Sequence, residues 1–341
     1  MYYPVQYGDP LETDRRLVEG VTIWDVAVER QVQITGPDAS RFVELLTPRD
    51  LSNCAVGQCK YIVLTGEDGG ILNDPILLRL AEDCYWLSLG DNDILLWAQG
   101  LAFGLNYDVH ISEPDVSPIQ VQGPKSKDVM VTLFGDWVSE LPYYRLKVTE
   151  LNEIPVVVAR TGYGGELGYE IYLRDSQYGD ALWDKIMAAG QDHDIGPGAS
   201  SPRRIESGIL SYGADITRDD NPFHVGLGRL VNLNKTSDFI GKAALLHAQD
   251  SGIDRKLVGV EIDIEPSRDI STERWPILND KEVQIGEVRS RGFSQRLRKY
   301  IGYAMLPMNQ TQEGTKVRLV AKWASASATV VALPFIKSRA K

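Results

Sequence analysis

Cysteine and histidine are scarce in this chain, which limits the metal and redox chemistry it can support. The 341 residues include 3 cysteines and 4 histidines. The cysteines form no CxxC pair and no zinc-type spacing with a histidine, and no histidine has metal-ligand spacing. A Ser-His-Asp order and a phosphate-binding glycine motif are missing too. We therefore expect no metal, and thiols that stay reduced in a cytoplasm.

Positive charge and long apolar runs are also in short supply. Lys and Arg number 36 against 47 Asp and Glu, for a formal net charge of -11. Nucleic-acid binding needs a basic footprint that no segment provides. The first residues have neither a basic nor an apolar signal region, and no apolar run reaches the ~18 residues of a membrane span. We expect a cytoplasmic protein without nucleic-acid or membrane partners.

What is present is enough apolar sequence for real cores, since 43% of the residues are hydrophobic. Periodicity predicts strands over 21–28, 31–34, 60–65, 71–80, 85–89, 107–111, 115–121 and 154–160. It predicts helices over 11–18, from 37 past 46, from a cap at Asp91 to 103, and over 128–133, 181–189 and 200–210. After residue 256 short strands at turn-rich spacing predict a separate all-β domain, with strands over 257–262, 283–288, 300–306 and 316–321.

The stretch RTGYGGELGYEIYL at residues 160–173 predicts a glycine-rich hairpin with one carboxylate on its return strand. In a strand, Tyr169 and Ile171 share one face while Glu170 and Tyr172 share the other. An acid beside an aromatic ring suits a flat heterocycle with N–H donors. A strand carboxylate that simply faces water is the alternative.

Two further polar clusters stand out. Asn73 and Asp74 are adjacent in a predicted hairpin, so only one of them is expected to point into a common site, and simple turn hydrogen bonds are the alternative. Arg203, Arg204 and Glu206 lie on a predicted helix, where a solvated face with local ion pairs is the alternative. Five tryptophans in apolar patterns are interpreted as core residues: Trp24, Trp86, Trp97, Trp183 and Trp323.

Six motifs together carry a resemblance that runs through nearly the whole chain: GGILNDP, VQGPK, RTGYGGELGYEIYL, RRIESGILSYGAD, IGEVRSRGFS and KYIGYAML. In this order they resemble the glycine-cleavage T-protein family of tetrahydrofolate-dependent aminomethyl and methyl transferases. Within that family, IWDVAVERQVQI, SEPDVSPIQVQGPK and DDNPFHVGLGRLVNL look most like dimethylsulfoniopropionate demethylases. Family members usually carry an upstream Arg-Thr-Pro-like segment, so we expect either a start placed late or a site that lacks this part.

The resemblance implies an α+β fold, a three-domain cloverleaf with two interleaved α+β domains around a folate channel and a C-terminal β-domain. We expect the first domain to comprise residues 1–50 and 112–160, and the second to comprise 51–111 and 161–250. The barrel-like third domain is expected over 251–341.

The same resemblance implies roles for individual residues. Glu170 matches the family's glutamate that holds the pterin by paired hydrogen bonds, for which glutamine would be a poor substitute. Arg204 and Tyr212 match its folate-side helix, and Tyr163 and Tyr172 would line the channel near the methyl donor. Tyr163 replaces a tryptophan expected in some demethylases, although a sulfonium can also sit against a tyrosine face.

In the implied reaction, N5 of tetrahydrofolate attacks a sulfonium methyl in line and a neutral thioether leaves, so positioning and electrostatics dominate. The implied catalytic pair is Asp74, which would stabilise the moving positive charge, and Asn73. Glycine-cleavage relatives commonly have Asp-Asp here, and Asn73 favours methyl over aminomethyl transfer from a lipoyl carrier protein. A non-catalytic folate-binding protein is a third reading, but the stretch at 239–243 lacks the cysteine of such relatives.

Overall fold

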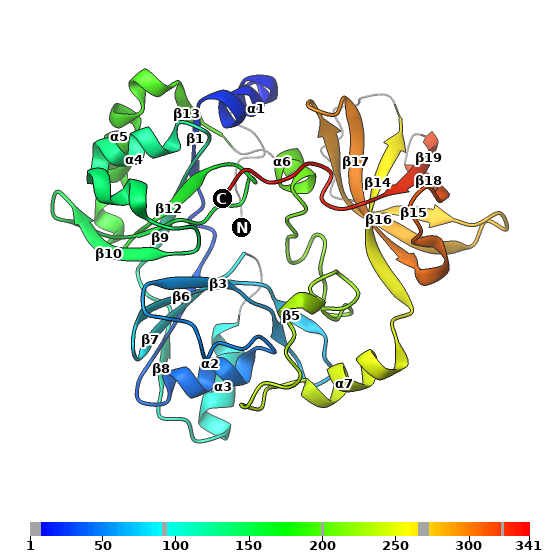
Figure 1. The fold of residues 1–341 in the computed structure, drawn as a ribbon, viewed down its shortest axis with the longest axis horizontal. Coiled ribbons are helices and arrows are strands. Elements are labelled where there is room, and N and C mark those ends of the chain that lie inside the picture. The colour runs from blue at the N-terminus through cyan, green and yellow to red at the C-terminus, as the bar shows by residue number, and fades with distance from the viewer. Residues whose placement is uncertain (1–7, 91–93, 199–200, 265–272, 322–323) are drawn as a thin grey trace.

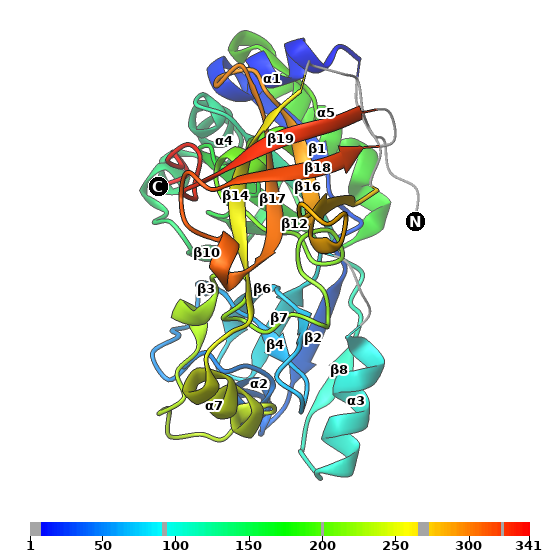
Figure 2. The ribbon, with the colours of Figure 1, turned by 90° about the vertical axis from the view of Figure 1, so that its right-hand side faces the viewer.

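The computed structural model describes residues 8–90, 94–198, 201–264, 273–321 and 324–341. The predicted cap Asp91 and Trp323 lie outside these residues. The chain forms three lobes that meet around a common centre (Figure 1). Viewed with the C-terminal lobe in front, the lobe that includes residues 58–88 lies below the other two (Figure 2).

The first lobe is a six-stranded sheet with a pair of helices packed on one face. In order across the sheet its strands are β10 (Leu146–Leu151), β11 (Ile154–Ala159), β12 (Gly168–Leu173), β9 (Ser117–Gln122), β1 (Val21–Asp25) and β13 (Ile195–Pro197). Its helices are α1 (Pro10–Glu19), α4 (Ser126–Phe134) and α5 (Gly179–Ala189). Apolar residues of α4 and α5, such as Met130 and Ile186, cover the strand face that carries Ile23. The opposite face of this sheet turns toward the second lobe.

The second lobe has a five-stranded sheet in the order β3 (Gln58–Tyr61), β6 (Ile76–Ala81), β7 (Cys84–Ser88), β2 (Gln31–Thr35) and β8 (His110–Ser112). A small hairpin, β4 (Leu64–Thr65) with β5 (Ile71–Asn73), stands beside it. The predicted single strand over 71–80 is wrong, because Pro75 has no N–H to continue a ladder and separates β5 from β6. The helices of this lobe are α2 (Ala39–Leu46), α3 (Leu95–Gly104) and α7 (Lys242–Ser251).

The sheets group the chain differently from the expected domain boundaries at residues 50 and 160. Strand β2 pairs with β7 along Gln31 to Thr35, so it belongs to the second sheet. Strand β12 pairs with both β11 and β9, so it belongs to the first. The chain crosses between the lobes after β1 and returns after β8, because backbone pairing, which a sequence pattern does not reveal, decides the grouping.

The third lobe confirms the predicted C-terminal all-β domain. It is a closed barrel of β14 (Arg255–Asp263), β17 (Lys299–Pro307), β16 (Gln284–Ser294), β15 (Trp275–Leu278), β18 (Lys316–Ala321) and β19 (Ala324–Val331). Its interior is filled by aliphatic and aromatic residues such as Val260, Ile277 and Leu319. Short 3₁₀ helices cover Asp136–Glu140, Ser176–Tyr178, Gln191–His193, Gly228–Leu230 and Met308–Gln310. Among the described residues, no helix combines the length and the apolar character needed to cross a bilayer.

The lobes are joined by α6 (Ser201–Glu206) and by the C-terminal segment, residues 332–341, which runs from the barrel back to the first lobe (Figure 1). Helix α6 is shorter than the predicted 200–210, because Gly208 takes a left-handed φ of 73° that ends it. The C-terminal segment is held by its backbone: the Arg339 N–H donates to the Gly165 carbonyl at 2.7 Å. It therefore crosses the loop of the glycine-rich hairpin.

A charge cluster with a buried centre, defined as Glu166, Arg203, Glu206, Arg296 and Arg339, ties α6 to the first lobe and the barrel. Arg203 lies 2.7 Å from both Glu166 and Glu206. Arg296 reaches Glu206 at 2.6 Å, and Arg339 reaches Glu166 at 3.0 Å. The solvated-face reading is wrong for Arg203 and Glu206, because both side chains are fully buried among these partners.

Candidate active site

Strand β12 divides its side chains between two faces as its alternation predicts. Tyr169 and Ile171 enter the core beneath α4 and α5. Glu170 and Tyr172 turn the other way, toward the second sheet, where the Tyr172 ring lies 6.0 Å from that of Trp86. We call this space between the facing sheets the seam. Its Tyr172 end is apolar and its Glu170 end is polar.

Glu170 is fixed in the seam through one of its two oxygens. Its Oε2 accepts hydrogen bonds from the Tyr172 hydroxyl, at 3.0 Å, and from the Thr161 hydroxyl. Burial raises the pKa of the Glu170 carboxyl, and the two hydroxyl donors oppose that rise. Within the described parts of the chain, Oε1 accepts no hydrogen bond. The protein thus orients the carboxyl through Oε2 alone.

A second carboxyl, Glu29, lies close to Glu170 and was missed by sequence reasoning. It stands in the connection between β1 and β2, where no periodicity marks a side chain as inward. Burial raises the pKa of Glu29 well above its usual range, and the charge of Glu170 raises it further. Ser88 is in hydrogen-bonding contact with both Glu29 and Tyr172. A polar chain therefore links the two carboxyls.

Asn73, the last residue of β5, and Asp74, which follows it, make different hydrogen bonds. Asn73 is fully buried and its Oδ1 accepts the Asp74 N–H at 2.9 Å, the local bond that turn geometry predicts. Asp74 accepts a hydrogen bond from the Tyr61 hydroxyl at 2.7 Å. Burial raises the pKa of Asp74 to about 7, with a smaller contribution from Asp215. Asp74 is the member of the pair that can exchange a proton near neutrality.

Arg204, Tyr163 and Asp215 form a third group, on α6 and the two loops near it. Arg204 lies 2.6 Å from Asp215 and donates to Ser290 of the barrel at 2.8 Å. Its guanidinium carbon sits 5.9 Å from the centre of the Tyr163 ring. Burial raises the pKa of Tyr163 to about 12, so it stays a phenol. Tyr212 packs against the apolar cluster between α6 and the barrel.

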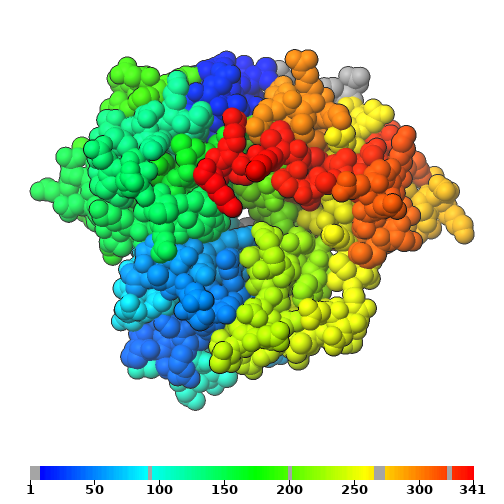
Figure 3. Space-filling view, viewed as in Figure 1, coloured from blue at the N-terminus to red at the C-terminus, as the bar shows by residue number. Residues whose placement is uncertain are grey.

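Five of the predicted site residues thus fall into two sets. Asp74, Tyr163 and Arg204 belong together, because the charge of Arg204 and that of Asp215 act on the pKa values of both Asp74 and Tyr163. Tyr172 groups with Glu170 through their hydrogen bond. The space-filling view shows a narrow gap where the three lobes meet, below the C-terminal segment (Figure 3). The individual roles of these residues stay predictions.

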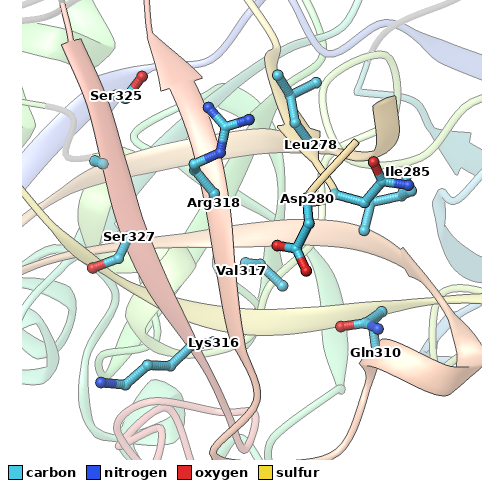
Figure 4. Close-up of a pocket in the computed structure, with 11 residues that line it drawn as sticks. Leu278, Asp280, Ile285, Gln310, Lys316, Val317, Arg318, Ser325 and Ser327 are labelled. Atoms are coloured by element: carbon cyan, nitrogen blue, oxygen red, sulfur yellow. The ribbon is translucent and has the colours of Figure 1, made fainter. Parts of the chain in front are cut away.

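A separate hollow of about 530 Å³ lies on the barrel, between β15, β18 and β19 (Figure 4). Arg318 lines it but is 2.6 Å from Glu282, so an exposed carboxylate already compensates its charge. None of the predicted site residues lines this hollow. The described residues also hold no group of three or more His, Cys, Asp or Glu arranged for a metal ion.

Comparison with known families identifies the class of this fold and site. The model of the GCVT N-terminal domain matches residues 1–235, and that of the glycine cleavage T-protein C-terminal barrel domain matches residues 255–337. The chain therefore belongs to the glycine cleavage T-protein family, as its motifs predict.

Individual relatives narrow the comparison. The chain is 40% identical, over 90% of its length and 84% of the relative's, to the dimethylsulfoniopropionate demethylase DmdA of Ruegeria pomeroyi. It is 32% identical to an aminomethyltransferase of Symbiobacterium thermophilum, over 98% of this chain and 91% of that one. The crystal structure of the glycine cleavage system aminomethyltransferase T from Bartonella henselae superposes with a TM-score of 0.87 at 25% identity, covering 99% of this chain and 92% of that one. The predicted fold and the prediction of an enzyme are confirmed.

Proposed function

We propose that this protein is a tetrahydrofolate-dependent methyl transferase that takes a methyl group from a sulfonium donor such as dimethylsulfoniopropionate. The observation that carries this proposal is the 40% identity to a demethylase of that compound, against 32% for an aminomethyltransferase. Asn73 supports it, because an amide is neither an acid nor a base and aminomethyl transfer must also release ammonia. The proposal keeps the cytoplasmic setting and the small-molecule partners expected from the sequence.

The seam fits the heterocycle of a folate. Bound tetrahydrofolate supplies N5 as the nucleophile and a ring edge with several N–H donors. Glu170 accepts such N–H groups through Oε1, while Thr161 and Tyr172 hold Oε2 in place. A charge-assisted bond of this kind favours the ionised carboxyl, so the ligand lowers a pKa that burial alone raises.

Asp74 acts on the proton that methyl transfer releases. The thioether leaves as a neutral molecule and needs no acid, whereas N5 carries a positive charge until its proton departs. Asp74 stabilises that charge and accepts the proton at its carboxyl oxygen, for which a pKa of about 7 is well matched to neutral pH. Burial and the nearby Asp74 raise the pKa of Tyr61 well above its usual range, so Tyr61 remains a donor that orients Asp74.

Tyr163 is the residue proposed to contact the donor. A sulfonium is a poorly hydrated cation and is attracted to the electron-rich face of an aromatic ring. Arg204 lies over one face of the Tyr163 ring at 5.9 Å, so the opposite face is the one proposed for the sulfonium group. The buried ion pair with Asp215 compensates the charge of Arg204, so it does not repel this cation strongly.

Aminomethyl transfer is the second candidate, and a product assay separates the two. We expect the purified protein, given tetrahydrofolate and dimethylsulfoniopropionate, to form 5-methyltetrahydrofolate and the demethylated thioether in equal amounts. Chromatography with mass detection follows both products, and a boiled sample is the control. If 5,10-methylenetetrahydrofolate forms instead, and only from an aminomethyl-lipoyl carrier, the order of the two candidates is reversed.

The Glu170→Ala variant tests the heterocycle site directly. Hydrogen bonds to charged groups contribute about 1.5–3 kcal/mol, so we expect tetrahydrofolate affinity to fall roughly tenfold to hundredfold. Glu170→Gln should fall almost as far, because it keeps the shape but loses the charge and one acceptor. Anaerobic calorimetry measures both, with the exposed Glu150→Ala on β10 as the control. Undiminished affinity in Glu170→Ala would show that this carboxyl does not hold the folate.

A further inference from the structure

Trp24 is buried, as its apolar pattern predicts, but it lies on the seam face of its sheet and not in the core beneath α4 and α5. On β1 it pairs with Gln120 of β9, which in turn pairs with Glu170 of β12. The three side chains form one row across neighbouring strands. They point to the same face, because Val21 and Ile23 occupy the opposite face of β1. Trp24 therefore stands on the side of the sheet that carries Glu170.

The indole N–H of Trp24 has no hydrogen-bond partner among the described residues, although the side chain is only 5% exposed. The other seam tryptophan behaves differently, since Trp86 donates its indole N–H to Gln33 at 2.9 Å. Buried indole N–H groups normally find an acceptor. Trp24 and Glu170 are two strands apart, about 9–10 Å, which a flat bicyclic ligand can span. An unpaired donor on the same face as the proposed ligand-binding carboxyl points to an acceptor on that ligand.

Gln31, on the facing sheet, carries an unpaired acceptor. Its Nε2 donates to Ser88 at 3.1 Å and to the Glu29 carbonyl at 2.7 Å. Its Oε1 is buried and accepts nothing from the described residues. Ser88 in turn contacts Tyr172, the residue that holds Glu170. Among the described residues, the seam thus offers an unpaired donor, the Trp24 indole N–H, and an unpaired acceptor, the Gln31 Oε1.

We propose that Trp24 and Gln31 complete the heterocycle site, with Trp24 donating to a ring carbonyl and Gln31 accepting an exocyclic amino N–H. This rests on the proposed function and names its specificity. A ring that satisfies these residues carries an amino group, whose N–H groups bind Gln31 and Glu170, and a ring N–H that also binds Glu170. A carbonyl next to that ring N–H accepts the hydrogen bond from Trp24. That order of groups is the edge of a 2-amino-4-oxo pyrimidine. The seam therefore selects a 4-oxo ring over a 4-amino ring, which would turn a donor toward Trp24 and would present an unprotonated ring nitrogen, in place of the ring N–H, to Glu170.

The test compares tetrahydrofolate with its 4-amino counterpart, tetrahydroaminopterin, by anaerobic calorimetry on the wild type and two variants. Trp24→Phe keeps a ring and deletes the donor, and we expect it to lose roughly fivefold to tenfold in affinity for the 4-oxo ligand alone. Gln31→Met should weaken both ligands by a similar factor, because both carry the 2-amino group. Thermal unfolding of each free variant, beside Trp97→Phe on α3, shows whether a loss reflects folding.

The outcomes separate this inference from the proposed function. A fall in the 4-oxo to 4-amino preference in Trp24→Phe, with an unfolding temperature close to that of Trp97→Phe, supports the assignment. Wild-type protein that binds tetrahydrofolate without preference, or a Trp24→Phe variant that weakens both ligands equally, overturns it while leaving the function intact. Failure of the wild type to bind tetrahydrofolate at all overturns the proposed function itself.

Discussion

Replacing Asp74 with asparagine is expected to lower the turnover number by about 10²–10⁴-fold, the usual contribution of a positioned acid or base. Tetrahydrofolate affinity should change little, because Glu170 rather than Asp74 is proposed to hold the ring. The Asn side chain fills the same space and can still accept the Tyr61 hydroxyl, so the geometry at the end of β5 is kept. Initial rates of methyl transfer and calorimetric affinities on one protein preparation check both halves of the expectation. Unchanged turnover would remove the catalytic role.

The pH dependence of the wild type and of the Asp74→Asn variant gives a second test of the same role. Asp74 must be deprotonated to accept a proton, and its pKa is about 7. We expect kcat/KM of the wild type to rise about tenfold per pH unit below 7 and to level off above it. The Asp74→Asn variant should show no such limb. A wild-type profile that is flat between pH 5.5 and 8.5 would mean that another group handles the proton.

The contribution of Asp74 to folding stability should fall as the pH rises, whereas kcat/KM should rise. The folded pKa of Asp74, about 7, lies above the usual aspartate value of 3.8, so the folded state binds the proton more tightly than the unfolded chain does. Its stabilising contribution is complete below about 3.8 and is lost as the pH rises through 7. At pH 8 the ionised carboxyl is therefore a cost, and Asp74→Asn should unfold at an equal or higher temperature than the wild type. A variant that is inactive but no less stable is the signature of a functional residue.

Local patterns predicted most of the elements and the direction of the key side chains. The alternation in β12 placed Glu170 and Tyr172 on one face because a strand has a period of two. The grouping of strands into sheets was not accessible, since β2 and β12 each pair with partners far along the chain. Local periodicity is blind to such pairing, and the family resemblance implied the cloverleaf but not its boundaries.

Candidate site residues were predictable only where a motif or strand alternation marked them. Glu29 lies in a connection without periodicity, and Trp24 looks like any apolar strand residue. Only the register across β1, β9 and β12 brings Trp24 into line with Glu170. The burial of Arg203 was not predicted either, because an arginine on a short helix is usually exposed. Only the folded chain shows the three carboxylates that lie within ion-pair distance of it.

Replacing Arg203 with methionine is expected to destabilise the protein by about 3–5 kcal/mol, because it leaves two buried carboxylates short of a counter-charge. Glu206 keeps Arg296 at 2.6 Å and Glu166 keeps the half-exposed Arg339 at 3.0 Å, so we expect the lower end of that range. Chemical denaturation measures the loss. The control is Arg41→Met, which breaks an ion pair with Asp38 but lies at the surface, 72% exposed, and should cost less than about 0.5 kcal/mol.

The same variant should disturb the site as well as the fold, because Glu166 stands in the loop between β11 and β12, four residues before Glu170. Arg203 fixes that loop from α6, and the C-terminal segment fixes it from the other side at Gly165. With Arg203 removed, the Thr161 and Tyr172 hydroxyls hold Glu170 less firmly, so tetrahydrofolate affinity should fall even where the variant is fully folded. Saturating tetrahydrofolate should then restore part of the lost stability by binding only the folded state. If Arg203→Met and Arg41→Met unfold at the same denaturant concentration, the cluster is not a stabilising junction between the lobes.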